Sequence, residues 1–185
     1  MKKLVFALFM LCGSHTFGQS MKITSNGFVD MTDLTKKYVI IDFPGISREQ
    51  LFKEMIKFIN ANYERPEEIT NVIANEQIVI NGHDWLKVEH GYLVGGLNAQ
   101  YIYKYDLQFR DGKIRFEPIF DHIKYRSNET LSLIGKKSWT AGTSGLFTEK
   151  GKVISKREVL LIDKKINEFI QSIKDKLTSV NGKDW

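Results

Sequence analysis

The chain has 185 residues, with 27 Lys and Arg against 22 Asp and Glu, which gives a formal charge of +5 at pH 7. Cys12 is the single cysteine, so the chain cannot form an internal disulfide. So small a positive excess, without a concentrated basic stripe, argues against nucleic-acid binding.

The N-terminus has the three-part pattern of a secretory signal peptide. Lys2 and Lys3 form a positively charged start, and the segment from Leu4 to Leu11 is apolar. Small Gly18 follows after a less apolar stretch, which is the order that signal peptidase recognises. We therefore expect cleavage after Gly18, within two residues, and a mature chain that begins at Gln19.

Two alternatives to a signal peptide at residues 1–18 are a membrane anchor and a lipoprotein signal. The apolar run has less than half of the roughly 20 residues that a spanning helix needs. A lipoprotein signal would use Cys12, but bulky Phe9, Met10 and Leu11 precede it where small residues are required. We therefore expect a periplasmic or secreted protein, without cysteine and with a formal charge of +3 once Lys2 and Lys3 are removed.

The mature chain begins with a polar lead-in, residues 19–35, which can add an edge strand. Tyr38–Phe43 is a β-branched and aromatic run that predicts a strand, and Pro44 and Gly45 end it.

A helix is predicted next. Ser47 and Gln50 have the spacing of a capping box. The apolar residues that follow recur at helical spacing, and they are Leu51, Phe52, Met55, Ile56 and Ile59. This helix should end near Tyr63. Two short runs downstream, Ile69–Ala74 and Gln77–Asn81, predict a hairpin.

The strongest local pattern predicts a second hairpin. Apolar and polar residues alternate along 101–110 and again along 113–117. Asp111-Gly112 between them suits a two-residue type I′ turn, in which both residues have positive φ. This turn fixes the register, so that Phe109 lies opposite Ile114 and Leu107 lies opposite Phe116.

A long amphipathic helix closes the chain, from about Ser155 to Ser179, with apolar residues at intervals of three and four. Residues 36–180 are therefore predicted to form a single α+β domain, in which two helices cover one face of a curved antiparallel sheet. Residues 124–152 fit this pattern poorly and are predicted to be a loop insertion.

The strand at Tyr38–Phe43, the Ser47-capped helix and the tyrosine-rich strand before Asp111-Gly112 resemble the domain-of-unknown-function family numbered 4468. The resemblance covers about residues 36–121. It implies a secreted protein, mostly found in Bacteroidota, with a TBP-like fold, and it implies no activity. An alternative fold is a helix-grip sheet, with Tyr101, Tyr103 and Tyr105 lining a ligand cavity between the sheet and the last helix.

The sequence contains no convincing catalytic or metal-binding constellation. His83 and His90 lie seven residues apart with Asp84 and Glu89 between them, but a zinc site needs three or four closely placed ligands, and solvated loop residues are the ordinary interpretation. Asp121-His122 offers two groups only. Residues 135–138 and 142–145 match the phosphate-loop and nucleophile-elbow patterns incompletely. We therefore expect no enzyme activity, cofactor or metal.

The glycine-rich segment 135–151 carries large apolar residues that either fold back on the domain or contact a partner. The candidate partner or ligand surface consists of Trp85, Trp139, Leu146 and Phe147. An exported interaction module with a protein or glycan partner is the favoured function. The alternative is a carrier of a small apolar ligand, held between the sheet and the C-terminal helix.

Overall fold

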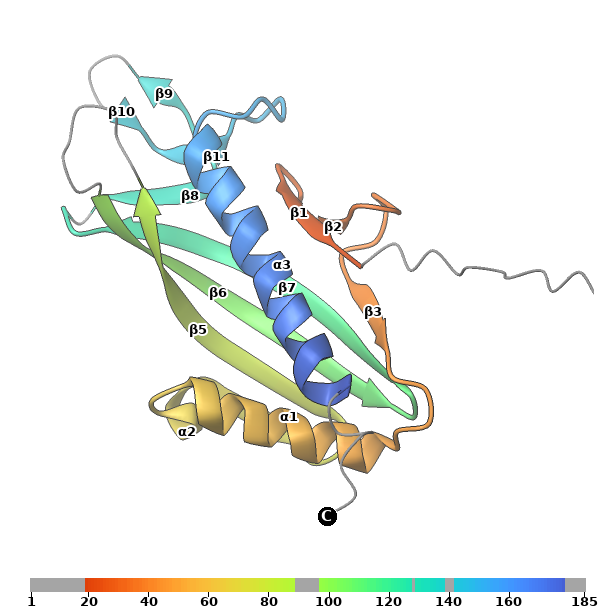
Figure 1. Cartoon of the computed structure of the whole chain (residues 1–185). Coiled ribbons are helices and arrows are strands. Elements are labelled where there is room, and N and C mark those ends of the chain that lie inside the picture. The colour runs from red at the N-terminus through yellow and green to blue at the C-terminus, as the bar shows by residue number, and fades with distance from the viewer. Residues whose placement is uncertain (1–18, 89–96, 128, 139–141, 179–185) are drawn as a thin grey trace, which may run out of the picture.

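The computed structural model describes residues 19–88, 97–127, 129–138 and 142–178. The predicted signal peptide, residues 1–18, lies outside the described residues. Figure 1 shows the described elements, with one long helix lying diagonally across a curved sheet.

The main sheet has seven strands in the order β11-β8-β7-β6-β5-β4, with β3 also paired to β7. Its strands are β3 (Val39–Asp42), β4 (Thr70–Ile73), β5 (Gln77–Val88), β6 (Leu97–Arg110), β7 (Lys113–Tyr125), β8 (Thr130–Ile134) and β11 (Gly145–Phe147). All neighbours are antiparallel except β11 and β8, which are parallel. Along one edge of β7, Lys113–Phe116 pair with β3, and Ile123 and Lys124 pair with β8.

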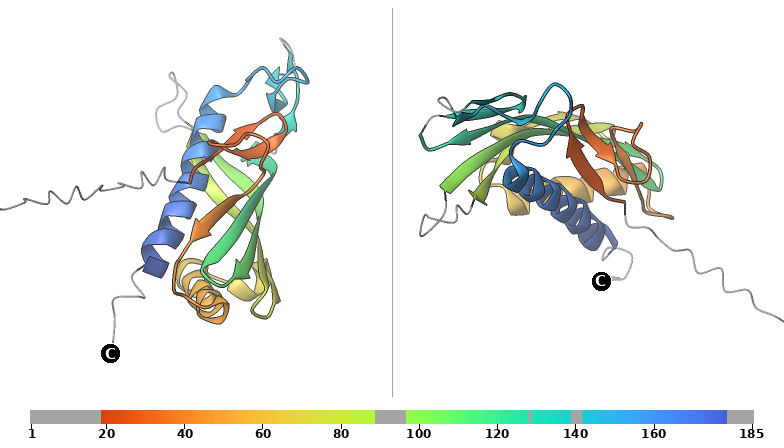
Figure 2. Two further views of the ribbon diagram at one scale, coloured as in Figure 1. Left: turned by 90° about the vertical axis from the view of Figure 1, so that its right-hand side faces the viewer. Right: turned by 90° about the horizontal axis from the view of Figure 1, so that it is seen from above.

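Three helices accompany the sheet, namely α1 (Arg48–Asn62), α2 (Pro66–Ile69) and α3 (Lys156–Thr178). The side chain of Ser47 accepts a hydrogen bond from the Gln50 amide, as the capping pattern predicts. Figure 2 shows the sheet curving around α3, with α1 on the same concave side. The predicted class, an α+β fold with a curved antiparallel sheet and two long helices on one face, is confirmed.

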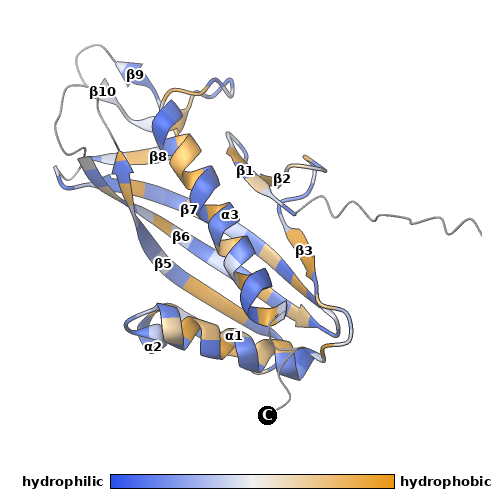
Figure 3. Cartoon of the chain, in the orientation of Figure 1, coloured by the Kyte–Doolittle hydropathy of each residue, from blue (hydrophilic) through white to orange (hydrophobic). Residues whose placement is uncertain are grey.

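Both predicted hairpins are confirmed, the second also in its predicted register. Strands β4 and β5 pair from Ile73 opposite Gln77 to Thr70 opposite Ile80. In the second hairpin Phe109 lies opposite Ile114 and Leu107 lies opposite Phe116. Hydrophobic and hydrophilic residues alternate along β5, β6 and β7 in Figure 3, so each strand presents one apolar face.

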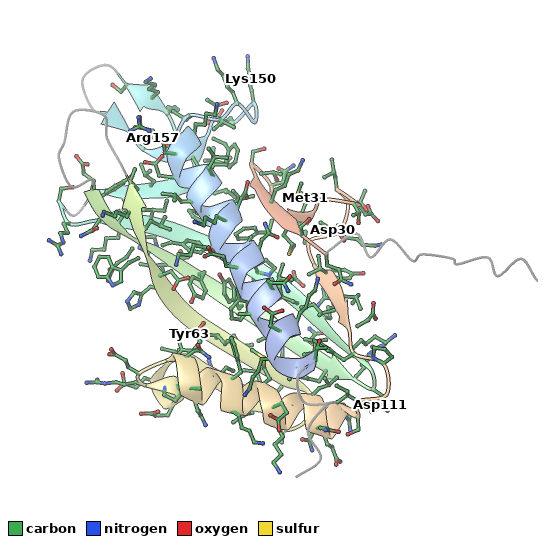
Figure 4. All side chains as sticks on the ribbon, viewed as in Figure 1. Asp30, Met31, Tyr63, Asp111, Lys150 and Arg157 are labelled. Carbon is green, nitrogen blue, oxygen red and sulfur yellow. The ribbon has the colours of Figure 1, made fainter. Side chains whose placement is uncertain are left out.

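The type I′ assignment of the Asp111-Gly112 turn is wrong. Gly112 has a φ of +71°, but Asn75 is the one non-glycine residue with positive φ in the described part of the chain. Contacts with the start of α1 explain the difference. The Asp111 carboxylate accepts a 2.8 Å hydrogen bond from the Arg48 amide, and the Gly112 amide donates to the Ile46 carbonyl at 2.8 Å. The hairpin tip therefore adapts to the helix start (Figure 4).

The core lies between α3 and the concave face of the sheet. Phe169 of α3 places its ring 4.7 Å from Tyr105 and 5.3 Å from Phe116, measured between ring centroids. Phe58 of α1 meets the same ring at 6.1 Å. One phenylalanine therefore joins both helices to the sheet.

The lead-in, residues 19–35, does not add an edge strand to the main sheet. It forms a separate two-stranded sheet from β1 (Met21–Thr24) and β2 (Gly27–Asp30). Side chains of α3 bind the backbone of β1: Asp163 accepts from the Ile23 amide at 2.7 Å, and Asn167 bonds both backbone groups of Met21 at 2.9 Å. These side chains bind backbone groups of β1 that a neighbouring strand would otherwise bind.

Residues 124–152 also differ from the predicted loop insertion, because β8 and β11 of this segment belong to the main sheet. The small strands β9 (Lys137–Ser138) and β10 (Gly142–Thr143) pair with each other beyond it. In the described segments, none of the helices is both long and apolar enough to cross a membrane.

The two faces of β7 should respond differently to truncation. Phe116 is fully buried, so Phe116→Ala should lower the free energy of unfolding by about 3–5 kcal/mol in urea denaturation. Arg115 on the opposite face lies over the Tyr38 ring at 4.2 Å and pairs with Glu117, so Arg115→Ala should cost less than about 1 kcal/mol. Equal losses would contradict a solvated convex face.

Candidate functional site

Two of the four candidate surface residues are buried. Leu146 is 0% exposed and Phe147 is 4% exposed, and both belong to the cluster of buried apolar residues, since β11 is part of the main sheet. They are therefore removed from the candidate surface. Trp139 lies outside the described residues. Trp85 is 54% exposed and keeps its place as a candidate.

Trp85 projects from the convex face of the sheet, away from the helices. The neighbouring outward residue, His83, meets its ring edge-on with the centroids 6.4 Å apart. His83 also lines a hollow of about 450 Å³ on the sheet, together with Ile102, Lys104 and Ile119. The ladder between β6 and β7 shifts register at Ile102, beside this hollow.

The surroundings of Trp85 are mostly basic. Exposed Lys87 is the next outward residue on β5, and exposed Lys124 is two strands away at the level of Trp85. Exposed Lys104 lines the hollow. Asp121 is the acidic residue among the residues that line it. We call Trp85, His83 and these three lysines the convex patch.

A second site lies on the concave side, where the end of α1 approaches β5 and α3. A pocket of about 320 Å³ opens there, and we call it the concave pocket. Its lining residues come from all three elements, and they are Phe58, Asn62, Tyr63, Asp84, Lys165, Glu168, Phe169 and Ser172. Tyr63, labelled in Figure 4, reaches from α1 toward the sheet.

Asp84 occupies a position that packing alone would give to an apolar residue. The even-numbered residues of β5 face the core, and Ile78, Ile80, Leu86 and Val88 are all buried. Asp84 follows the same alternation and is partly buried opposite Tyr101. A carboxylate at such a position costs stability unless it has a polar partner.

Gly82, two residues before Asp84, makes room for Tyr103. A Cβ atom at position 82 would lie 2.9 Å from the Tyr103 hydroxyl and 3.0 Å from its ring. The Tyr103 ring stacks on Tyr105 at 3.9 Å, and its hydroxyl meets the Tyr63 hydroxyl at 3.3 Å. Tyr103 therefore packs behind Tyr63, which lines the pocket.

The electrostatics of Asp84 are dominated by burial, which raises the pKa of its carboxyl above the ordinary value. Lys165 on α3 is the next largest influence and lowers the pKa. No hydrogen bond or ion pair to the Asp84 carboxylate occurs within the described part of the chain. Burial likewise raises the pKa of Tyr63 and Tyr103 beside it.

Two of the four residues weighed as zinc ligands in the sequence, His83 and Asp84, lie within the described residues. His83 and Asp84 are neighbours on a strand, so their side chains point to opposite faces of the sheet. Glu89 and His90 lie outside the described residues. No group of three metal-ligating side chains comes together in the segments that the structure describes.

The concave pocket was missed by the sequence interpretation, because the predicted strand ended at Asn81. The strand in fact continues to Val88, which brings Asp84 into phase with buried aliphatic residues. The sequence does contain a signal for this site: apolar residues alternate along 78–88, and Asp84 takes the place of one of them.

The described residues form an α+β domain with one candidate site on each side of its sheet. No family model matches the chain, and no curated protein matches it. Among solved structures, a DUF4468 family protein from Bacteroides ovatus ATCC 8483 is similar, with a TM-score of 0.50 and 15% identity over 80% of this chain and 85% of that one. The likeness agrees with the resemblance noted in the sequence and shows the fold, whereas the TBP-like description stays a prediction.

Replacing the Asp84 carboxylate should stabilise the protein at neutral pH. Because its pKa is raised in the folded state, folding disfavours the charged form, and the carboxylate lowers stability at pH 7. Thermal unfolding at pH 7 should give a higher Tm for Asp84→Asn, with the gain vanishing below the ordinary carboxyl pKa of about 4. The control is Asp121→Asn, since the Asp121 side chain is 65% exposed. A lower Tm for Asp84→Asn at pH 7 would mean that the carboxylate has a stabilising partner.

Proposed function

We propose that the protein is an exported, non-catalytic interaction module, whose convex patch binds an acidic segment of a partner protein. The observation that carries the proposal is the exposure of Trp85, 54% on a regular strand. Tryptophan is enriched among the residues that dominate binding energy at protein interfaces.

The edge of the sheet beside Trp85 supports an extended partner segment. Strand β4 pairs with β5 only as far as Ile80. From residue 81 to residue 88, β5 pairs with β6 on one side, and no described strand pairs with its other edge. Such an edge accepts an added strand. The three lysines of the convex patch favour an acidic sequence in that strand. Export rests on the signal-peptide pattern of residues 1–18.

The alternative of an apolar-ligand carrier has less support. A helix-grip carrier holds its ligand between the sheet and the last helix. In this protein Phe169 lies there, 4.7 Å from Tyr105 and 5.3 Å from Phe116. Tyr101, Tyr103 and Tyr105 are each at most 2% exposed and belong to the core.

Photo-crosslinking in the living host tests the interaction module. A benzophenone amino acid at position 85 should give one discrete adduct with a protein partner, because the side chain at this position contacts it. Changing Lys87 and Lys104 to Glu in the same protein should reduce the adduct several-fold, since the partner segment is acidic.

The matched control places the benzophenone at Leu160, which is 58% exposed on α3 and lies outside the convex patch. Adducts of equal yield from both positions would indicate unspecific collision. The absence of an adduct from position 85 would likewise overturn the proposal.

A further inference from the structure

The concave pocket is lined by two residues of opposite charge that form no ion pair with each other in the described structure. Asp84 comes from β5 and Lys165 from α3. Yet no ion pair within 4.0 Å joins them among the described contacts. The pocket that both residues line has a volume of about 320 Å³, which leaves room for a bridging molecule.

The other polar groups of the pocket already have partners. Glu168 pairs with Lys164 at 3.7 Å. The Asn62 amide donates to the Phe58 carbonyl at 2.7 Å, and the Ser172 hydroxyl donates to the Phe169 carbonyl at 2.8 Å. Asp84 and Lys165 are the charged groups of the pocket that have no ion-pair partner among the described residues.

The remaining walls are aromatic. Phe58 and Phe169 meet edge-to-face at 6.1 Å, and Tyr63 lies beside them. Aromatic rings of this kind pack well against an apolar or aromatic ligand side chain. The pocket thus combines a negatively charged side chain, Asp84, a positively charged side chain, Lys165, and an apolar wall.

We propose that the concave pocket binds a small zwitterion of the α-amino-acid type. Its ammonium group lies against Asp84, its carboxylate against Lys165 and its apolar side chain against Phe58 and Phe169. A simple amine would bring a positive charge close to Lys165, and a simple carboxylate would bring a negative charge close to Asp84. A molecule with both charges satisfies both residues. This site is on the opposite face from the convex patch and does not depend on the proposed function.

The test uses L-phenylalanine as the probe, with phenethylamine and 3-phenylpropanoate as analogues that each lack one charge. The purified, ¹⁵N-labelled protein is titrated with each compound at pH 7, and amide shifts of Asn62, Asp84 and Lys165 are followed. L-phenylalanine should give saturable shifts at these residues. Each analogue should bind at least about tenfold more weakly, which corresponds to losing one charged contact.

Variants then assign the two contacts. Asp84→Asn and Lys165→Met should each weaken L-phenylalanine binding by about tenfold or more, whereas Asp121→Asn on the convex face should leave it unchanged. The unperturbed part of each variant's spectrum reports that the fold is intact. Non-saturable shifts, equal binding of the analogues, or equal effects of Asp84→Asn and Asp121→Asn would each overturn the proposal.

Discussion

The packing of α3 across the concave face is the constraint on which the rest of the structure depends. Phe169 contacts Tyr105, Phe116 and Phe58, so one side chain joins the sheet to both helices. The same helix also carries Asp163 and Asn167, which bind the backbone of β1 and hold the N-terminal hairpin. Loss of α3 would therefore expose the tyrosines of β6 and release the hairpin together.

This packing leaves polar groups in places where an apolar core would be more stable. The hydroxyl groups of Tyr101 and Tyr105 are buried without a hydrogen-bond partner in the described part of the structure. A buried hydroxyl of this kind costs about 1–3 kcal/mol. Asp84 adds a carboxylate to the inward face of β5. Ligand-binding sites commonly contain groups that lower the stability of the fold, and the Asp84 carboxylate in the concave pocket is such a group.

The sequence predicted the elements whose local signals agree with their tertiary surroundings. The register of the β6–β7 hairpin follows from alternation and a short loop, and α1 begins where Ser47 and Gln50 indicate. The turn type was mispredicted because Asp111 bonds to Arg48, a contact between residues distant in sequence. Strands β8 and β11 were missed for a similar reason: each is short, and their pairing depends on partners elsewhere in the fold.

The candidate sites were less predictable than the fold. Exposure of Trp85 depends on which face of β5 meets the helices, and burial of Leu146 and Phe147 depends on the pairing of β11. The concave pocket forms where α1, β5 and α3 come together, and a local sequence pattern does not predict contacts between elements so distant in the chain. Its one sequence signal is an aspartate in phase with buried aliphatic residues.

The proposed ligand site depends most directly on the partly buried Asp84 carboxylate, which has no ion-pair partner among the described residues. Carbon-13 NMR of the side-chain carboxyls, followed over pH in the absence of ligand, measures this. We predict a pKa for Asp84 above the ordinary aspartate value of about 4, because burial outweighs the attraction of Lys165. A pKa for Asp84 below that ordinary value would show that Lys165 pairs with it directly, and that the concave pocket has no free charges to offer a ligand.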